Sequence, residues 1–160
     1  MKKLIYTLVI LAFVSSVSAQ WVQMSSGMGT SRYVYSFASD GNNIYAGSGI
    51  YPTYTGVYKS TNNGVNWTQT ALNNRTVIAL ATLGNNIFAG ADNEPDGAVG
   101  VYFSTNNGIN WTQTGLNHHY IRTIAILGTT VFAGTTDSGV FCSTNNGTMW
   151  ILTSLNNRYP

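Results

Sequence analysis

Residues 56–70 read GVYKSTNNGVNWTQT, and close copies follow at residues 100–114 (GVYFSTNNGINWTQT) and 139–153 (GVFCSTNNGTMWILT). Each copy places short runs of strand-forming residues on both sides of Asn-Asn-Gly. Asn and Gly tolerate the positive φ that tight turns require, so this pattern favours a tight β-hairpin. Three copies in one chain indicate a protein built from repeated hairpins.

The hairpin belongs to a longer repeat, framed by tryptophans at spacings of 46, 44 and 39 residues: Trp21, Trp67, Trp111 and Trp150. The first strand of each unit is predicted at residues 33–39, 76–82 and 121–126. A second strand is predicted at residues 44–47, 87–90 and 131–134. With the hairpin, each unit has four short strands in about 40 to 45 residues, the pattern of a β-propeller blade. We therefore predict an all-β propeller of four-stranded antiparallel blades.

The first strand of each unit is predicted to be the innermost. Val77 to Ala81 is apolar on both faces, which favours a strand buried between neighbouring sheets near the propeller axis. Chain length varies mainly after the second strand, between Gly47 and Gly56 and at the equivalent points of the other units. In a propeller this loop opens on the same face as the connections between blades, where we expect a ligand.

The predicted units are residues 21–67, 67–111 and 111–150, with the start of another unit at residues 150–160. Residues 21–24 (WVQM) align with the outermost strand that begins at Trp67 (WTQT). About three blades form an open arc, because known propellers close with about four to eight. We expect residues 20–160 to be part of a larger propeller whose remaining blades lie in the same chain. Self-assembly of subunits is the alternative.

The first 19 residues have the pattern of a secretory signal peptide. Lys2 and Lys3 precede an apolar run at residues 4–14, and a small-residue cleavage site ends at Ala19. A buried N-terminal helix is the alternative. We expect export, with cleavage after Ala19, to the periplasm, cell surface or exterior. No second apolar run approaches the length of a membrane span, so an integral membrane protein is not expected.

Without the signal peptide the charges balance. The remaining sequence contains five basic residues (Arg32, Lys59, Arg75, Arg122 and Arg158) and five acidic ones (Asp40, Asp92, Glu94, Asp96 and Asp137). Nucleic-acid binding needs a dense basic patch, so we do not expect a nucleic-acid partner. The single cysteine, Cys142, has no His or acid beside it at a recognisable spacing and is assigned no chemistry.

The hairpin stretches closely resemble the Asp-box, or bacterial neuraminidase repeat, written Ser-x-Asp-x-Gly-x-x-Trp. The matching residues are Ser60, Asn62, Gly64 and Trp67; Ser104, Asn106, Gly108 and Trp111; and Ser143, Asn145, Gly147 and Trp150. All three copies carry Asn where the family usually has Asp. The resemblance implies a structural corner, in which Ser and Asn cap the turn, Gly accepts its φ and Trp packs between blades.

The chain looks like the propeller group that includes sialidases, sortilin-type receptors, xyloglucan-cleaving hydrolases and photosystem II stability/assembly factors. The last group is the most similar in its Gly-Val-Tyr hairpins. In sialidases, arginines clamp a substrate carboxylate. Aligning the units places Arg32, Arg75, His119 and Arg158 at one equivalent position. The resemblance implies that they surround the channel mouth, where they could hold an anionic or carbohydrate ligand. A repeated structural arginine is the alternative.

Two variable loops supply further candidate ligand-binding residues. Asp92, Glu94 and Asp96 could bind Ca²⁺ through alternating oxygens, although a solvated acidic loop fits the spacing better, so no metal is expected. Tyr51 and Tyr54 could stack on a sugar or a partner, and loop packing is the alternative. Glycosidases need two acids across the scissile bond, and the acids here are too few to assign any catalytic residue.

These observations favour a secreted, non-enzymatic β-propeller scaffold that binds a protein or a glycan through loops on one face, without a cofactor. A glycoside hydrolase, sialidase-like or xyloglucan-hydrolase-like, whose catalytic acids lie in further blades is one alternative. An assembly chaperone like the photosystem II factor is another, on the resemblance of fold alone.

Overall fold

The computed structural model describes residues 22–29, 33–50, 52–91 and 99–156, which form three antiparallel sheets of four strands. Blade 1 contains β1 (Val34–Ser39), β2 (Ile44–Ile50), β3 (Thr53–Ser60) and β4 (Thr68–Gln69). Blade 2 contains β5 (Val77–Leu83), β6 (Asn86–Ala91), β7 (Gly100–Ser104) and β8 (Thr112–Asn117). Blade 3 contains β9 (Ile121–Leu127), β10 (Thr130–Thr135), β11 (Gly139–Ser143) and β12 (Ile151–Asn156). The described residues contain no helix, which confirms the all-β prediction.

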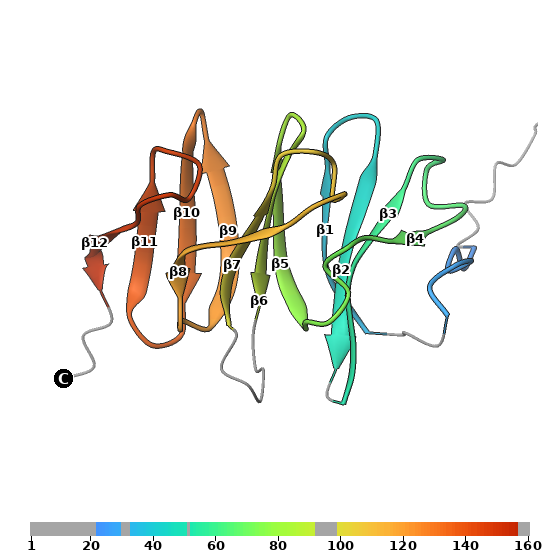
Figure 1. Cartoon of the computed structure of the whole chain (residues 1–160), viewed down its shortest axis with the longest axis horizontal. Helices are drawn as coiled ribbons and strands as arrows, with labels where there is room; N and C mark the ends of the chain where they lie inside the picture. Colours follow the sequence, from blue (N-terminus) through green and yellow to red (C-terminus); the bar gives the residue numbers. More distant parts are fainter. Residues whose placement is uncertain (1–21, 30–32, 51, 92–98, 157–160) are drawn as a thin grey trace, which may run out of the picture.

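The three blades stand side by side in an open arc (Figure 1). Within each blade the strands follow one another as a meander, and every neighbouring pair is antiparallel. The first strands β1, β5 and β9 contact one another across the blades. The prediction that the first strand of each unit is innermost is therefore confirmed, and the order of strands is that of propeller blades.

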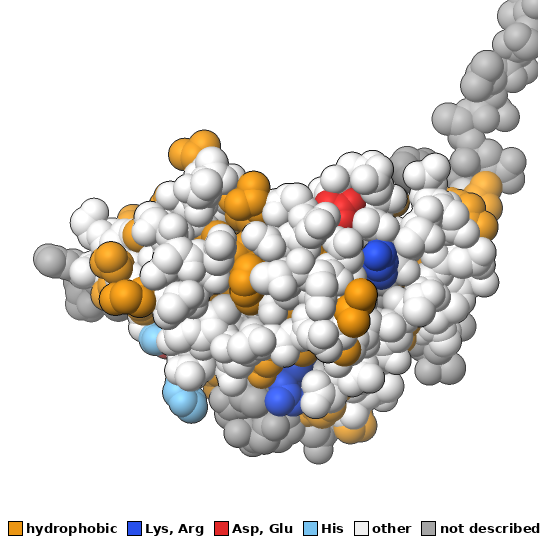
Figure 2. All heavy atoms as spheres, turned by 45° about the horizontal axis from the view of Figure 1, so that its top comes forward, with side chains coloured by type: hydrophobic (Ala, Val, Ile, Leu, Met, Phe, Trp, Pro, Cys, Tyr) orange, Lys and Arg blue, Asp and Glu red, His pale blue; other side chains and the backbone are white. Residues whose placement is uncertain are grey.

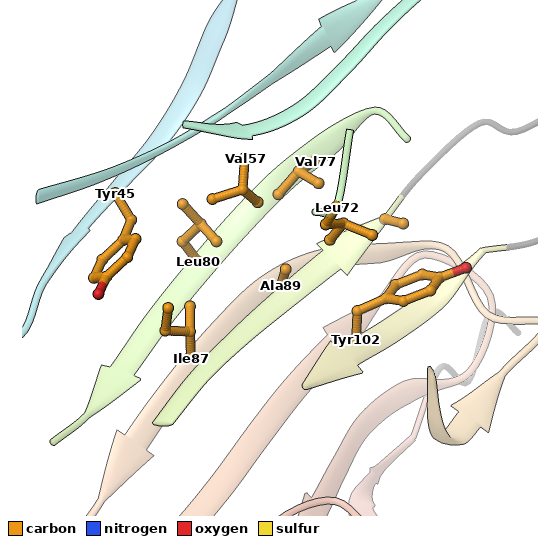
Figure 3. Close-up of a cluster of buried hydrophobic side chains, with 9 residues drawn as sticks. Tyr45, Val57, Leu72, Val77, Leu80, Ile87, Ala89 and Tyr102 are labelled. Carbon is orange, nitrogen blue, oxygen red and sulfur yellow. The ribbon is translucent and has the colours of Figure 1, made fainter. Parts of the chain in front are cut away.

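Two apolar clusters hold the blades together. The first joins Tyr45 and Val57 of blade 1 to Val77, Leu80 and Ile87 of blade 2 (Figure 3). Its burial explains why the first two strands of a unit are so apolar, because a strand inside the arc has a neighbouring sheet on each face.

The second cluster joins blade 2 to blade 3. Phe88 and Val101 of blade 2 pack there against Ile121 and Val131 of blade 3, and all four are fully buried. Ile87 belongs to the first cluster and the next residue, Phe88, to the second, because successive side chains of a strand point to opposite faces. Blade 2 is thus a sheet with a core on both faces.

Side chains organise the connection from the third strand to the fourth. In blade 2 the Ser104 hydroxyl donates to Asn106 Oδ1 at 3.1 Å and accepts the N–H of Gly108 at 3.0 Å. Asn106 Oδ1 also accepts the N–H of Asn110 at 2.9 Å. Asn107 and Gly108 have φ values of 56° and 83°. Ser104 and Asn106 therefore cap this turn and Gly108 takes a positive φ, as expected.

The same bonds recur in blades 1 and 3, where Ser60 and Ser143 are the buried serines. The predicted β-hairpin is present, but its turn is wider than the tight turn expected, since seven residues separate β3 from β4 and also β7 from β8. Asn-Gly does take positive φ in each copy. The turn is wider because the Ser and Asn side chains supply partners for main-chain N–H groups.

Replacing Asn106 with aspartate is expected to stabilise the protein. In Asn106→Asp the carboxylate would accept from Ser104 and Asn110 as a charged group, and charge-assisted hydrogen bonds are stronger than neutral ones. We expect about 1 kcal/mol more unfolding free energy in urea at pH 7. The gain should be lost as the pH falls below the ordinary aspartate pKa.

The matched control is Asn110→Asp, which adds the same charge to the same loop where the main chain, not the side chain, donates the hydrogen bond. An equal gain in both variants would contradict the hydrogen-bond explanation.

The three described tryptophans are not equally buried. Trp67 is 7% exposed, and Trp111 and Trp150 are half-buried, so none of the three is solvent-exposed, as expected for tryptophans that pack between blades. Trp111 and Trp150 pack at the edges of the two clusters between blades and donate their indole N–H to carbonyls of their own loops, those of Gly108 and Gly147. Trp67 lies under residues 24–28, and its Nε1 donates to the carbonyl of Met24 at 3.1 Å.

Candidate binding face at the blade connections

The connections between blades lie at the same end of the sheets as the loops from second to third strand. Gly56 N donates to the carbonyl of Arg75 at 2.9 Å, and Thr136 N donates to the carbonyl of Tyr120 at 3.1 Å. Each bond ties a connection between blades to a strand or loop of the neighbouring sheet. We call this end the connection face and define it by residues 73–76, 118–120 and 136–138, along the lower edge in Figure 1.

Arg75 is held against an aromatic ring on the connection face. Its Nε donates to the hydroxyl of Tyr102 at 3.0 Å, and its Nη1 donates to the carbonyl of Asn74 at 2.9 Å. The guanidinium carbon lies 5.8 Å from the centre of the Tyr102 ring, within the range of a cation–π contact. Arg75 is half-buried, so its positive charge is held in one orientation near the surface.

His119, Asp137 and Ser138 form a second polar group on the same face. His119 Nδ1 lies 2.7 Å from Asp137 Oδ2, and the Ser138 hydroxyl donates to the same oxygen at 3.3 Å. Burial raises the pKa of Asp137, but the hydrogen bond from His119, a main-chain hydrogen bond, the attraction to His119 and the hydrogen bond from Ser138 together lower this pKa below its usual value. The carboxylate therefore stays charged at neutral pH.

This group does not have the geometry of a catalytic triad. Ser138 Oγ approaches Nδ1 of His119 at 3.5 Å, the same nitrogen that faces Asp137. A base that activates a serine uses one ring nitrogen for the serine and the other for the carboxylate. The three side chains instead tie the connection before β9 to the loop between β10 and β11.

Arg75 and His119 occupy equivalent places, as the alignment of the units predicts. Each lies two residues before the first strand of its blade and contacts an aromatic residue of the third strand, Tyr102 in β7 and Phe141 in β11. The His119 and Phe141 ring centres are 4.9 Å apart. Both side chains thus lie over the third strand, farther from the innermost strand than the expected position at the channel mouth.

The remaining predicted site residues divide into two groups. Tyr54 is half-buried at the start of β3. The others lie outside the described residues: Arg32, Tyr51, Asp92, Glu94, Asp96 and Arg158. The predicted signal peptide and Trp21 also lie outside them. The sequence interpretation missed the contacts that Tyr102 and Ser138 make at this face, although the repeated Gly-Val-Tyr pattern marks Tyr102.

The other end of the sheets carries Asp40, in the turn between β1 and β2. Burial raises the pKa of Asp40, but hydrogen bonds from the Asn43 side chain, the N–H groups of Asn42 and Asn43, and the Tyr45 hydroxyl lower it to about 2. Asp40 is therefore a charged turn cap. Asp40 belongs to blade 1 and Asp137 to blade 3, so the two described carboxylates do not converge on one site.

Within the described ranges, no group of three or more His, Cys, Asp or Glu side chains is placed to hold a metal ion. No helix in the same part of the chain has the length and apolar character needed to cross a membrane.

No protein-family model and no curated protein matches the sequence. Solved structures do match the fold. The structure of YCF48 bound to D1 peptide has a TM-score of 0.58 at 14% identity and matches 74% of this chain and 38% of its own. The GH74 xyloglucanase from Xanthomonas campestris has a TM-score of 0.60 at 14% identity, over 78% of this chain and 24% of its own. The designed Ika4 protein has a TM-score of 0.59 at 15% identity, over 82% and 78%.

These likenesses show that the fold is that of a β-propeller. The chain spans well under half the length of YCF48 and of the xyloglucanase. At such low identities the comparison establishes the fold alone, and it does not choose between the activities of the two proteins.

Proposed function

We propose that this protein is an exported, non-enzymatic scaffold of Asp-box type that binds a segment of another protein on the connection face. One observation carries the proposal: adjacent blades hold Arg75 and His119 at equivalent positions, each against an aromatic ring of the third strand. In both blades a polar side chain packs on an aromatic ring at the same place on one face. Such a repeat suits an extended peptide that crosses neighbouring blades. The guanidinium charge of Arg75 attracts carboxylates, so the segment should be acidic.

Two further observations support this proposal over hydrolysis. The YCF48 structure similar to this chain contains a bound peptide, which is a precedent for protein binding on this fold. Glycoside hydrolysis by paired carboxylates requires two acids about 5 to 9.5 Å apart, and the two acids among the described residues, Asp40 and Asp137, belong to blade 1 and blade 3. Export rests on the signal pattern of residues 1–19, with cleavage after Ala19.

The test uses a display library of short random peptides, selected on the purified protein, and measures the best peptide by fluorescence anisotropy. Acidic peptides should be enriched, and their affinity should fall as salt rises. We expect Arg75→Ala to weaken binding at least about tenfold, because a hydrogen bond to a charged group contributes about 1.5 to 3 kcal/mol.

Lys59→Ala is the matched control. Its ammonium also lies over a tyrosine ring, 5.9 Å from the centre of Tyr45, but outside the connection face. This variant should bind as the wild type does. A large fall in melting temperature for Arg75→Ala with unchanged binding would show that Arg75 stabilises the fold and does not bind the peptide. Enrichment of no peptide, together with release of sugar from xyloglucan oligosaccharides, would favour the hydrolase instead.

A further inference from the structure

Adjacent blades meet in a groove at the end of the sheets that carries the Ser-Asn-Gly loops, opposite the connection face. Its walls are the fourth strand of one blade and the loop between the third and fourth strands of the next. The larger groove, between blades 2 and 3, has a volume of about 490 Å³. The smaller groove, between blades 1 and 2, has a volume of about 220 Å³. The Thr-Gln-Thr residues of the fourth strand line both, at 112–114 and 68–70, so the grooves are equivalent.

Hydrogen bonds hold the two walls of the larger groove against each other. The main-chain N–H of Gly115 donates to the carbonyl of Gly147 at 3.3 Å, and the indole N–H of Trp150 donates to the hydroxyl of Thr114 at 3.2 Å. The Ser and Asn side chains of the loop hold it from within. Walls fixed in this way lose little conformational freedom when a ligand binds, which favours affinity.

An aromatic ring distinguishes the larger groove from the smaller one. Phe103 is half-buried and lines the larger groove, and its ring stacks on the buried ring of Phe88 with 4.6 Å between the centres. In the smaller groove the equivalent residue is Lys59, whose ammonium lies over the ring of Tyr45. The stacking on Phe88 fixes the orientation of Phe103, which offers an apolar surface to the C–H groups of a ligand.

The polar lining of the larger groove is neutral. Among the described residues, no charged side chain lines it. Thr112, Asn146 and Thr148 line it and are exposed, and their side chains make no hydrogen bond within the described part of the chain. Hydroxyl and amide groups can both donate and accept hydrogen bonds, so these three suit a ligand with several hydroxyl groups. Figure 2 turns this end of the sheets forward and shows a surface with few charged side chains.

We propose that the larger groove binds a neutral saccharide. The ring of Phe103 lies against C–H groups of one sugar, and the hydroxyl and amide groups of the walls bind its hydroxyls. Phosphates and carboxylates are poor ligands here, because no cation of the described residues lines the groove. A peptide strand is disfavoured because the edge of β8 is closed at Gly115, whose N–H already donates to the loop of blade 3. The site lies at the other end of the sheets from the connection face, so it does not depend on the proposed peptide binding.

The test screens the purified chain against immobilised neutral oligosaccharides of glucose, galactose, mannose and xylose. The best of them is then titrated into the isotopically labelled protein and followed by NMR. The amide signals of residues 112–115 and 146–148 and the indole signal of Trp150 should shift, and those of residues 68–71 in the smaller groove should not. Binding of none of these sugars, or shifts confined to the connection face, would overturn the proposal. Shifts of the same signals by a selected acidic peptide and by no sugar would also overturn it.

Two substitutions give the larger groove the lining of the smaller one. Phe103→Lys introduces the side chain that the fold accepts at Lys59, and it should weaken sugar binding at least about tenfold because the ring is lost. Thr148→Ile introduces the side chain found at Ile109 and should weaken binding about threefold or more, because a hydroxyl partner is lost. Circular dichroism verifies that both variants fold. Ile109→Thr, the reverse change in the smaller groove, should bind sugar as the wild type does. Unchanged binding by Phe103→Lys, or equal weakening by Ile109→Thr, would contradict the assignment.

Discussion

Replacing Phe88 with alanine is expected to lower the unfolding free energy by about 3 to 5 kcal/mol, the usual cost of removing a buried phenylalanine. Phe88 is 0% exposed at the interface of blades 2 and 3, and its ring stacks on Phe103 with 4.6 Å between the ring centres. The cavity would lie between two sheets that are each held by further strands, so the surroundings can collapse only partly. Urea denaturation followed by tryptophan fluorescence measures the change.

Phe132→Ala is the matched control for this prediction. Phe132 is equivalent to Phe88 but is only half-buried, because no sheet formed by the described residues covers that face of blade 3. The loss of the Phe132 ring should lower the unfolding free energy clearly less than the loss of the Phe88 ring. Equal costs would mean that the covering blade contributes little to stability, which would contradict the packing described for the second cluster.

The sequence was sufficient to predict the blades because their pattern is local and repeated. Period-two apolar runs, glycine turns and regularly spaced tryptophans each reflect a short-range rule, and three copies make accidental matches improbable. The innermost position of β5 also followed from its apolar residues on both faces. The extent of tryptophan burial did not follow, because it depends on which segment covers each ring. Trp67 is covered by residues 24–28, and the half-buried Trp111 and Trp150 are not.

The connection face was predicted less completely. Aligning the units predicted that Arg75 and His119 are equivalent, and the structure places each of them two residues before the first strand of its blade. The alignment could not find their contacts with Tyr102 and Asp137, since those residues lie 27 and 18 positions away in sequence and approach only through the pairing of strands. The hairpin turn was misjudged for a related reason. Asn-Gly specifies the backbone angles, whereas Ser104 and its bond to Gly108 set the width of the turn.

The repeat also separates two kinds of surface on one molecule. Side chains such as Phe88 and Leu116 belong to a position that the fold buries in every blade that has a neighbour. The same position is exposed in blade 3, where no sheet of the described residues covers it, so its apolar character reflects packing between blades. Arg75 and His119 instead occupy a position that is polar and half-buried in blades with different neighbours. Such a position is better suited to recognition.

Gly56→Ala is expected to be among the most damaging substitutions of a single methyl group in the chain. Gly56 has φ +67°, a conformation that costs other residues about 1 to 2 kcal/mol. An added Cβ would also collide with the carbonyl oxygen of Leu72, whose position is fixed by its hydrogen bond from Val57 N at 2.8 Å. The added Cβ and the Leu72 oxygen are both fixed to the main chain, so no side chain can rotate to relieve the collision.

Gly84→Ala separates the two effects, because Gly84 has φ +58° and open space where its Cβ would be. The unfolding free energy of this control should fall only by the conformational cost of about 1 to 2 kcal/mol. The unfolding free energy of Gly56→Ala should fall by the same amount and by about a further 1 to 3 kcal/mol, because the added methyl group forces β3 or the connection ahead of β5 to move. Urea denaturation of both variants gives the difference. Equal losses would show that the connection yields freely to the added methyl group, and that the bond between Leu72 and Val57 does not hold it in place.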